Sequence, residues 1–269
     1  MTEVEWQRLK AHEIRRLAEQ DAVVILPVAS IEQHGPHLPT MTDTRLGHEF
    51  AVRAARLASQ TRPVVVAPVL WSGLSEHHMT FGGTLTIGPD TFRALVSDLV
   101  TALTRQGFRH ILIANSHGGN TIALQQICNE LAATSPATLV MTSYASEAAA
   151  EIKEILEDQD GLQHACEAET SMMMACEGAL VDDSDLAGLA NTKGRTFLRA
   201  GKGSYRWRPF THLTGNGVAG DPTRSSADKG TRLLEAGAAS LAALITDPQT
   251  WEDPEDLRSG DVGGVAFRD

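Results

Sequence analysis

The sequence predicts an α/β protein whose parallel sheet is covered by helices on both faces. Four short apolar segments have the length and the β-branched content of buried strands. Segments with the apolar spacing of helices lie between them, and this alternation is typical of parallel sheets that are buried on both sides. The predicted strands are residues 22–28, 63–69, 110–114 and 138–143.

Helices are predicted before, between and after these strands. Near the start of the chain, Trp6, Leu9 and Ile14 lie close to helical spacing among charged residues, which indicates an amphipathic helix. Pro89 suits the first turn of a later helix, where its missing amide hydrogen is not needed. Residues 191–221 are expected to be irregular. The other predicted helices are residues 44–57, 89–106, 121–132, 147–157, 165–176 and 228–245.

The composition excludes several classes of protein. A net charge of −11 argues against nonspecific nucleic-acid binding and against a polybasic membrane contact. Three cysteines without CxxC spacing indicate neither a disulfide framework nor a cysteine-rich zinc site. The first twenty residues lack the apolar core of a signal peptide, so a cytoplasmic location is expected. No linker or internal repeat is recognisable, and residues 1–269 are expected to form one domain.

A Gly/Pro-rich loop after the first predicted strand carries two carboxylates and two imidazoles within residues 31–43. Glutamate, histidine and aspartate are ligands that borderline divalent metals prefer. Glu32 and His34 point to the same side if the segment is extended. Asp43, just before a predicted helix, has two oxygens with which to bridge two cations. The alternative is a polar turn that happens to contain histidines.

A second polar turn, residues 115–120, directly follows the third predicted strand and contains His117. This imidazole is a further candidate metal ligand. Gly118 and Gly119 allow the backbone to approach a metal or a substrate closely, and their N–H groups at a helix start are suited to bind a developing oxyanion. The alternative is a structural glycine turn.

A third group of titratable residues lies at 164–171. If this segment is helical, His164 and Glu167 share one face, and Glu169 lies about one and a half turns from His164. One of these carboxylates is expected to complete a metal site. The alternative is a solvated helix face without any ligand.

Together, these motifs resemble those of the creatininase family. The loop EQHGPHLPxxTD, the turn NSHGGN and the segment HAxExETS match family motifs in order over roughly residues 22–171. The segment EHHMTFGGT resembles the family's EHxxFPGT loop, with Gly82 where proline is common. The resemblance implies a three-layer α/β/α sandwich with a mainly parallel sheet, two divalent metal ions per chain (zinc, manganese or iron) and homohexamers.

The resemblance also implies which residues bind metal. Glu32 and His117 would hold one ion, His34 would hold the other, and Asp43 would bridge both. Creatininase itself has a glutamate ligand two residues beyond the histidine that matches His117, where this chain has Gly119.

We therefore expect Glu169 to complete the second metal site, with Glu167 as the alternative. His164 is expected either to give a proton to the leaving nitrogen, oriented by a neighbouring carboxylate such as Glu167, or to stabilise the tetrahedral intermediate. The residues expected to line the substrate pocket are Ser75, His78, Gly118 and Gly119.

The predicted function is metal-dependent hydrolysis of a non-peptide C–N bond, such as a cyclic amide or a formamide of a small molecule, by metal-activated water. Relatives with an HGGN turn include a formamidopyrimidine deformylase, a mycofactocin-maturing peptidase and an enzyme that opens a keto-inositol ring. The alternatives are hydrolysis of a lactone or cyclic ketone at the same site, and a non-catalytic metal-binding assembly protein. Lys202, Arg206, Trp207 and Arg208 either contact an anionic or ring substrate or belong to the surface.

Overall fold

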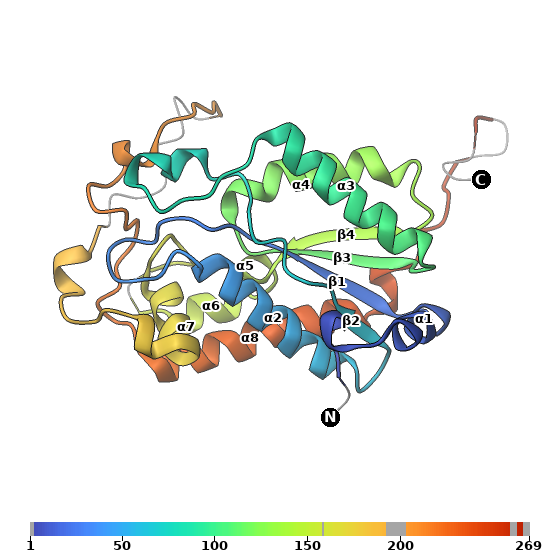
Figure 1. Ribbon diagram of the computed structural model, residues 1–269, viewed down its shortest axis with the longest axis horizontal. Coiled ribbons are helices and arrows are strands. Elements are labelled where there is room, and N and C mark those ends of the chain that lie inside the picture. The colour runs from blue at the N-terminus through green and yellow to red at the C-terminus, as the bar shows by residue number, and fades with distance from the viewer. Residues whose placement is uncertain (1–2, 158, 192–202, 259–262, 266–269) are drawn as a thin grey trace.

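Four parallel strands form one sheet in the part of the chain that the structure describes (Figure 1). The strands are β1 (Val23–Val28), β2 (Val64–Val66), β3 (His110–Asn115) and β4 (Thr138–Ser143). Their order is β2-β1-β3-β4, and the register of β1 against β3 places Val28 opposite Asn115. The computed structural model describes residues 3–157, 159–191, 203–258 and 263–265. The predicted strands are therefore confirmed, although β2 is shorter than expected.

Helices cover both faces of the sheet, which confirms the expected α/β/α sandwich (Figure 1). Apolar side chains of β1 alternate between the two faces, so that Val24 and Leu26 belong to one core and Val23 and Ile25 to the other. The first core contacts α1 (Ala11–Glu19), α3 (Pro89–Arg105) and α4 (Thr121–Ala132). The second core contacts α2 (Thr42–Ala58), α7 (Glu167–Glu177) and α8 (Ala227–Thr246).

Two predicted helices differ from the observed ones. The segment predicted as one helix over 147–157 forms α5 (Tyr144–Glu147) and α6 (Ala149–Ile155). Helix α7 begins at Glu167 and not at residue 165, because Ala165 has a φ of 53° and Cys166 is extended. The prediction that His164 and Glu167 share a helical face is therefore wrong: His164 precedes the helix, and its backbone pairs with Ala219.

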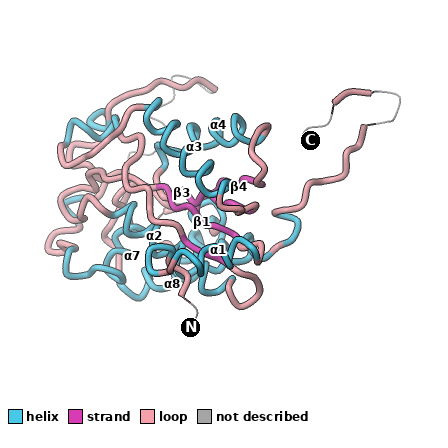
Figure 2. Tube along the Cα trace, turned by 45° about the vertical axis from the view of Figure 1, so that its right-hand side comes forward, coloured by secondary structure: helices cyan, strands magenta, loops and turns pink. Residues whose placement is uncertain are grey.

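The end of the described chain runs away from the body of the molecule (Figures 1 and 2). A short 3-10 helix, Pro248–Thr250, still packs against the fold, because the indole N–H of Trp251 donates to the carbonyl of Ile245 at 2.9 Å. Residues 252–258 are exposed.

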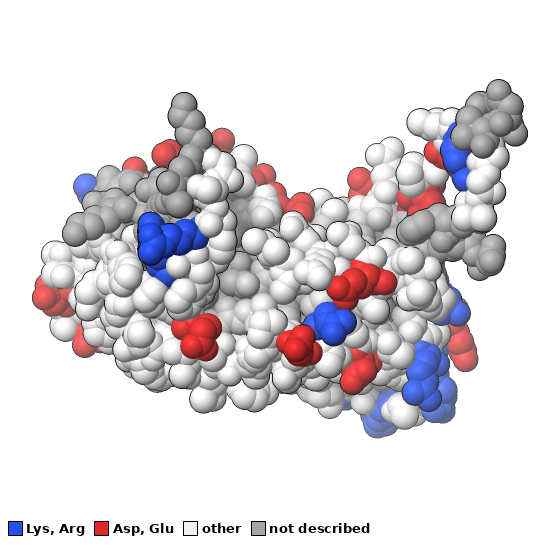
Figure 3. All heavy atoms as spheres, turned by 90° about the horizontal axis from the view of Figure 1, so that it is seen from above, with Lys and Arg blue, Asp and Glu red and all other residues white. Residues whose placement is uncertain are grey.

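None of the described helices is both long enough and apolar enough to span a membrane. On the face drawn in Figure 3, charged side chains of both signs lie scattered among uncharged ones.

Candidate metal centre

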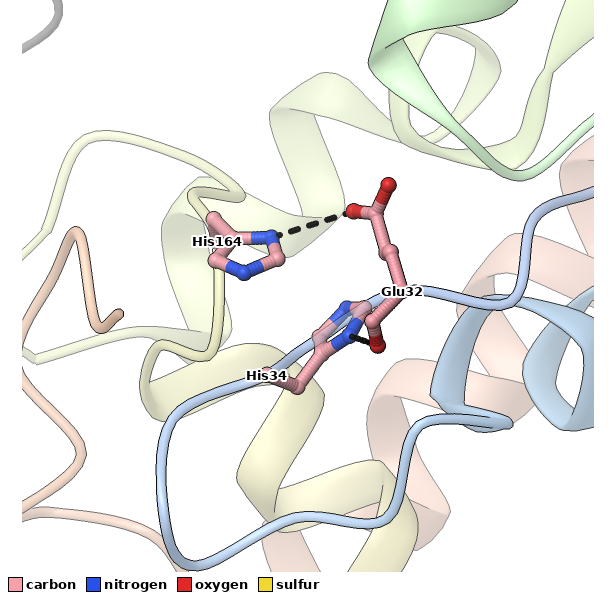
Figure 4. Close-up of side chains that lie close together, drawn as sticks. All are labelled: Glu32, His34 and His164. Atoms are coloured by element: carbon pink, nitrogen blue, oxygen red, sulfur yellow. Dashed lines mark hydrogen bonds and ion pairs between the residues drawn. The ribbon is translucent and has the colours of Figure 1, made fainter. Parts of the chain in front are cut away.

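The carboxyl ends of β1 and β3 bring two of the polar motifs together, at the edge where parallel α/β sheets usually bind ligands, and the start of α7 brings the third beside them. The loop after β1 carries Glu32 and His34, which lie beside His164 from the segment before α7 (Figure 4). Asp43 stands in the first turn of α2, His117 follows β3, and Glu169 stands in the first turn of α7. The five residues predicted to bind metal are all buried, with exposed fractions of 4% or less.

His34 is oriented by the backbone of its own loop. Its Nδ1 lies 3.1 Å from the carbonyl oxygen of Glu32, which accepts the ring proton. Its Nε2 then points at two carboxylates, 3.2 Å from Asp43 Oδ1 and 3.8 Å from Glu169 Oε2. This is the arrangement in which a ligand histidine is usually held.

His117 is held in a similar way, with the two nitrogens exchanged. Its Nε2 lies 3.1 Å from the carbonyl oxygen of Leu74, and its Nδ1 lies 3.0 Å from Asp43 Oδ2 and 3.2 Å from Glu32 Oε2. The side chain of Asn115 fixes the turn, because it donates to the carbonyl of His117 at 2.7 Å. The two oxygens of Asp43 thus face two different imidazoles.

The charges of the cluster shift its pKa values strongly. Burial alone would lower the pKa of His34, but the carboxylates of Asp43 and Glu169 raise it to about 10. Burial raises the pKa of Glu169 to about 7, against the opposing effect of His34. Burial would also raise the pKa of Glu32, yet His117 holds it well below its ordinary value. The buried carboxylates of the cluster are thus balanced by the imidazoles of His34 and His117, which burial alone would keep neutral.

This donor set fits divalent metal ions. The buried Nε2 of His34 and Oδ2 of Asp43 lie 3.2 Å and 3.0 Å from ionisable groups, yet neither atom makes an aligned hydrogen bond, which is unusual for buried polar atoms. Imidazole and carboxylate ligands suit zinc, manganese and iron. Among the described residues, three groups offer ligand atoms within 4.8 Å of one another: His34–Asp43–Glu169, Glu32–His34–His164 and Glu32–His77–His117.

The structure does not bring Glu167 to this cluster, contrary to the expectation that it neighbours His164. Its fully buried carboxylate pairs with the ammonium of Lys229 on α8 and accepts from the backbone N–H of Glu157 at 3.2 Å. Two positions along α7, Glu169 turns back and accepts from the backbone N–H of Ala165 at 2.5 Å. Glu167 is therefore paired with a lysine away from the cluster, whereas Glu169 lies within it.

Among the residues predicted to contact substrate, His78, Gly118 and Gly119 line a pocket above the cluster, as do His164 and Trp207. Ser75 does not line it. Its hydroxyl is fully buried and donates to Glu32 Oε2 at 2.6 Å, so it supports a carboxylate of the cluster.

The pocket has a volume of about 750 Å³, and four of the five metal-ligand candidates line it: Glu32, Asp43, His117 and Glu169. Apolar and aromatic side chains form its walls, and neither Arg206 nor Arg208 lines it. Lys202 lies outside the described residues. The apolar wall residues are Leu74, Ile87, Ile122, Leu162, Tyr205, Trp207, Phe210 and Leu213.

Two residues of the site were not singled out from the sequence. His77 reaches the cluster next to His117, with 5.8 Å between their ring centroids. Gln33 contacts both His78 and His164. The doubled histidine after Glu76 is a signal for the first, and the position of Gln33 between the predicted ligands Glu32 and His34 is a signal for the second.

Comparison with known proteins identifies a family and several similar proteins. Residues 7–245 match the family described as creatininase (creatinine amidohydrolase). The chain is 30% identical over 227 residues to the mycofactocin precursor peptide peptidase of Mycolicibacterium smegmatis, covering 82% of this chain and 83% of that protein. It is 26% identical over 268 residues to the 3-dehydro-scyllo-inosose hydrolase of Thermotoga maritima, covering 91% and 84%. A solved structure named "Creatininase Mn" matches with a TM-score of 0.75 and 25% identity, covering 91% of this chain and 98% of that one.

Proposed function

The chain belongs to the creatininase family, and from this premise we propose that it is a metal-dependent hydrolase that cleaves an amide-type C–N bond of a small molecule. The observation that supports the proposal most strongly is the buried cluster of ionisable side chains, four of which line the pocket. There, two imidazoles are oriented by backbone carbonyls so that the other nitrogen of each ring faces carboxylates, three in all. So many buried ionisable groups are costly unless a cation joins them.

We assign two metal positions to this cluster. Glu32 and His117 would hold one ion, and His34 and Glu169 the other. Asp43 would lie between them, which is supported by its two oxygens facing different imidazoles. Zinc, manganese and iron all suit these ligands, and one similar solved structure carries manganese in its name.

Divalent ions in these positions would supply a water molecule acidic enough to attack a carbonyl near neutral pH, and they would polarise that carbonyl. The residues of the chain would do the rest. The apolar walls would exclude bulk water and seat the substrate. The backbone at Gly118 and Gly119 would approach the carbonyl oxygen, and His164 would contact the reacting amide from the side of Glu32.

Metal content decides this proposal. We expect about two metal ions per chain by elemental analysis of protein purified without chelators, as a two-metal hydrolytic site requires. Asp43→Asn keeps the size of the side chain but removes its charge, and should lose most of this metal. The matched control is Asp98→Asn, an exposed aspartate on α3, which should keep it.

The loaded protein would then be tested on cyclic amides, N-formyl amines and short peptides, each with and without chelator. A native protein that takes up no zinc, manganese or iron would contradict the proposal. It would favour instead a binding or scaffold role.

A second candidate is cleavage of a cyclic ketone or lactone at the same site. The similarity to an inosose hydrolase favours it, and the same acidified water would attack such a ring. Product analysis with a keto-inositol substrate separates it from amide hydrolysis.

We also propose a cytoplasmic homohexamer. Unpaired cysteines fit a reducing compartment. Large apolar side chains exposed in the loop between β2 and α3 fit an interface, among them Trp71 at 52% and Leu85 at 57%.

A further inference from the structure

Three aromatic side chains, Tyr205, Trp207 and Phe210, form one wall of the pocket, here called the aromatic wall. Tyr205 and Trp207 are 66% and 50% exposed, whereas Phe210 is 5% exposed. The ring centroid of Phe210 lies 4.3 Å from that of His78 and 5.0 Å from that of His164. One stretch of chain therefore lines the pocket from the solvent to the imidazoles.

The local backbone turns the outer two rings of this wall to the same side. Residues 204–209 form no helix. Tyr205 and Trp207 line the pocket, whereas Arg206 and Arg208 do not. Such alternation is typical of an extended segment, in which successive side chains point to opposite sides. The two cationic side chains are thus kept out of the pocket although they neighbour its aromatic residues.

The inner end of the aromatic wall is held by packing, and its outer end is open. Phe210, Leu213 and Ala219 form a small buried apolar cluster, with Phe81 packed against it. The outer rings keep large exposed faces, and apolar surface at the mouth of a pocket is typical of surface that a ligand covers. Aromatic rings are suited to contact another flat ring, either stacked or edge to face.

The charges of the pocket select against an anionic substrate. Among the described residues that line it, none is a lysine or an arginine, the side chains that bind carboxylates and phosphates. Glu76 adds an exposed carboxylate that neither metal position uses. A volume of about 750 Å³ leaves room for a bulky group beyond the amide itself. These features favour an uncharged substrate that carries a bulky apolar group.

We propose that the aromatic wall is a specificity subsite for an uncharged aromatic group carried by the amide nitrogen of the substrate. This inference rests on the proposed function, in which Gly118 and Gly119 approach the carbonyl oxygen and His164 contacts the amide. Because Phe210 packs against His164, the wall adjoins the nitrogen side of the amide. Hydrolysis puts the hydroxyl of water on the carbonyl carbon and a proton on the nitrogen, so the products are a carboxylic acid and an aryl-substituted amine.

Binding of an inert analogue tests the subsite without turnover. Sulfonamides resist hydrolysis, and N-benzylmethanesulfonamide differs from N-methylmethanesulfonamide only in the ring offered to the wall. Calorimetry with zinc-loaded and with metal-free protein should show the benzyl compound binding about 10–100-fold more tightly, the usual effect of burying an aromatic ring. Trp207→Ala should reduce this preference by about tenfold. Trp207→Phe keeps an aromatic face and should retain most of it.

Leu180→Ala provides the matched control. Leu180 is 53% exposed, close to the value for Trp207, but it does not line the pocket, so its truncation should leave both affinities unchanged. Thermal unfolding of Trp207→Ala should match that of the native protein, because the side chain is half-exposed. A carboxylate added to the benzyl ring of the analogue should abolish the gain in affinity, since the described lining offers it no cation.

Turnover of the metal-loaded protein tests on which side of the amide the ring is held. N-benzylformamide should exceed N-methylformamide in kcat/KM by about 10–100-fold, and Trp207→Ala should reduce that ratio mainly through KM. N-methyl-2-phenylacetamide carries its ring on the acyl side and should gain no such advantage.

Equal binding of the two sulfonamides would overturn the inference, and so would a benzyl preference that is unchanged in Trp207→Ala or a larger advantage for the acyl-side ring. Hydrolysis of the formamides without any preference would overturn the inference and leave the proposed function standing. Tight binding of the benzyl sulfonamide that depends on Trp207, in a protein that hydrolyses no amide, would support the subsite and overturn only the proposed function.

Discussion

At the metal-ligand cluster, protons and metal ions compete for the same nitrogens. The pKa of His34 is raised to about 10, so in metal-free protein this ring is protonated throughout the neutral range. His117 also has a pKa well above its ordinary value, since Glu32 and Asp43 outweigh the effect of burial. A metal ion must therefore displace at least one proton in order to bind.

The affinity for zinc should accordingly fall as the pH is lowered. The pH range from 8.5 to 6.5 lies below the pKa of His34, so the ring stays protonated throughout it. Each proton that the metal displaces should therefore weaken binding by about tenfold for every pH unit that the pH is lowered. Competition with a chromophoric chelator at several pH values measures this, and calorimetry in two buffers counts the protons. An affinity that does not change over this range would contradict the raised pKa values.

At the scale of elements, a buried ion pair joins α7 to α8 behind the cluster. Lys229 on α8 contacts Glu167 on α7 and Glu157 at 2.9 Å. The two helices pack so closely here that a Cβ at Gly230 would overlap the carbonyl of Ser171. This contact fixes the first turn of α7, from which Glu169 reaches the metal-ligand cluster.

Removing one partner of this pair should be costly. Lys229→Met leaves the carboxylate of Glu167 buried without its cation, and should lower the free energy of unfolding by about 3 kcal/mol or more. Adding Glu167→Gln should recover part of the loss, since no charge is then left unpaired. Urea unfolding of the metal-free variants measures both effects.

Lys153→Met provides the matched control for this experiment. It removes an ion pair with Asp160 whose side chains are 63% and 97% exposed, and should change stability by less than about 1 kcal/mol. Equal losses for Lys229→Met and Lys153→Met would contradict a special role of the buried pair.

At the scale of the whole molecule, the apolar surface between β2 and α3 predicts self-association. Light scattering should give a mass about six times the 28.9 kDa of the chain, as the family resemblance implies. Trp71→Glu with Leu85→Glu should reduce that mass, because charge would be buried in the interface. Leu257→Glu is the control, since Leu257 is 88% exposed in the C-terminal segment. A monomer at micromolar concentration would contradict the prediction.

Much of the fold could be predicted from the sequence because its signals are local. The apolar runs that form β1, β3 and β4 and the helical spacing in α3 and α4 specify their elements within a few residues. The start of α7 could not be predicted, because it depends on Ala165, whose φ of 53° has no signature in an ordinary alanine. That residue separates His164 from the helix.

The identities of the candidate ligands were likewise readable from the sequence. Their side-chain chemistry and their place after strands suffice to predict that Glu32, His34, Asp43 and His117 meet at one edge of the sheet.

Only the tertiary structure shows that Glu169 lies beside His34, whereas Glu167 faces away from the cluster and pairs with Lys229. This difference depends on a partner far away in the chain, since Lys229 on α8 forms an ion pair with Glu167. A sequence determines which groups a site can contain through local periodicity and side-chain chemistry. Which of those groups face one another is a property of long-range packing, and so it emerges only when the chain is folded.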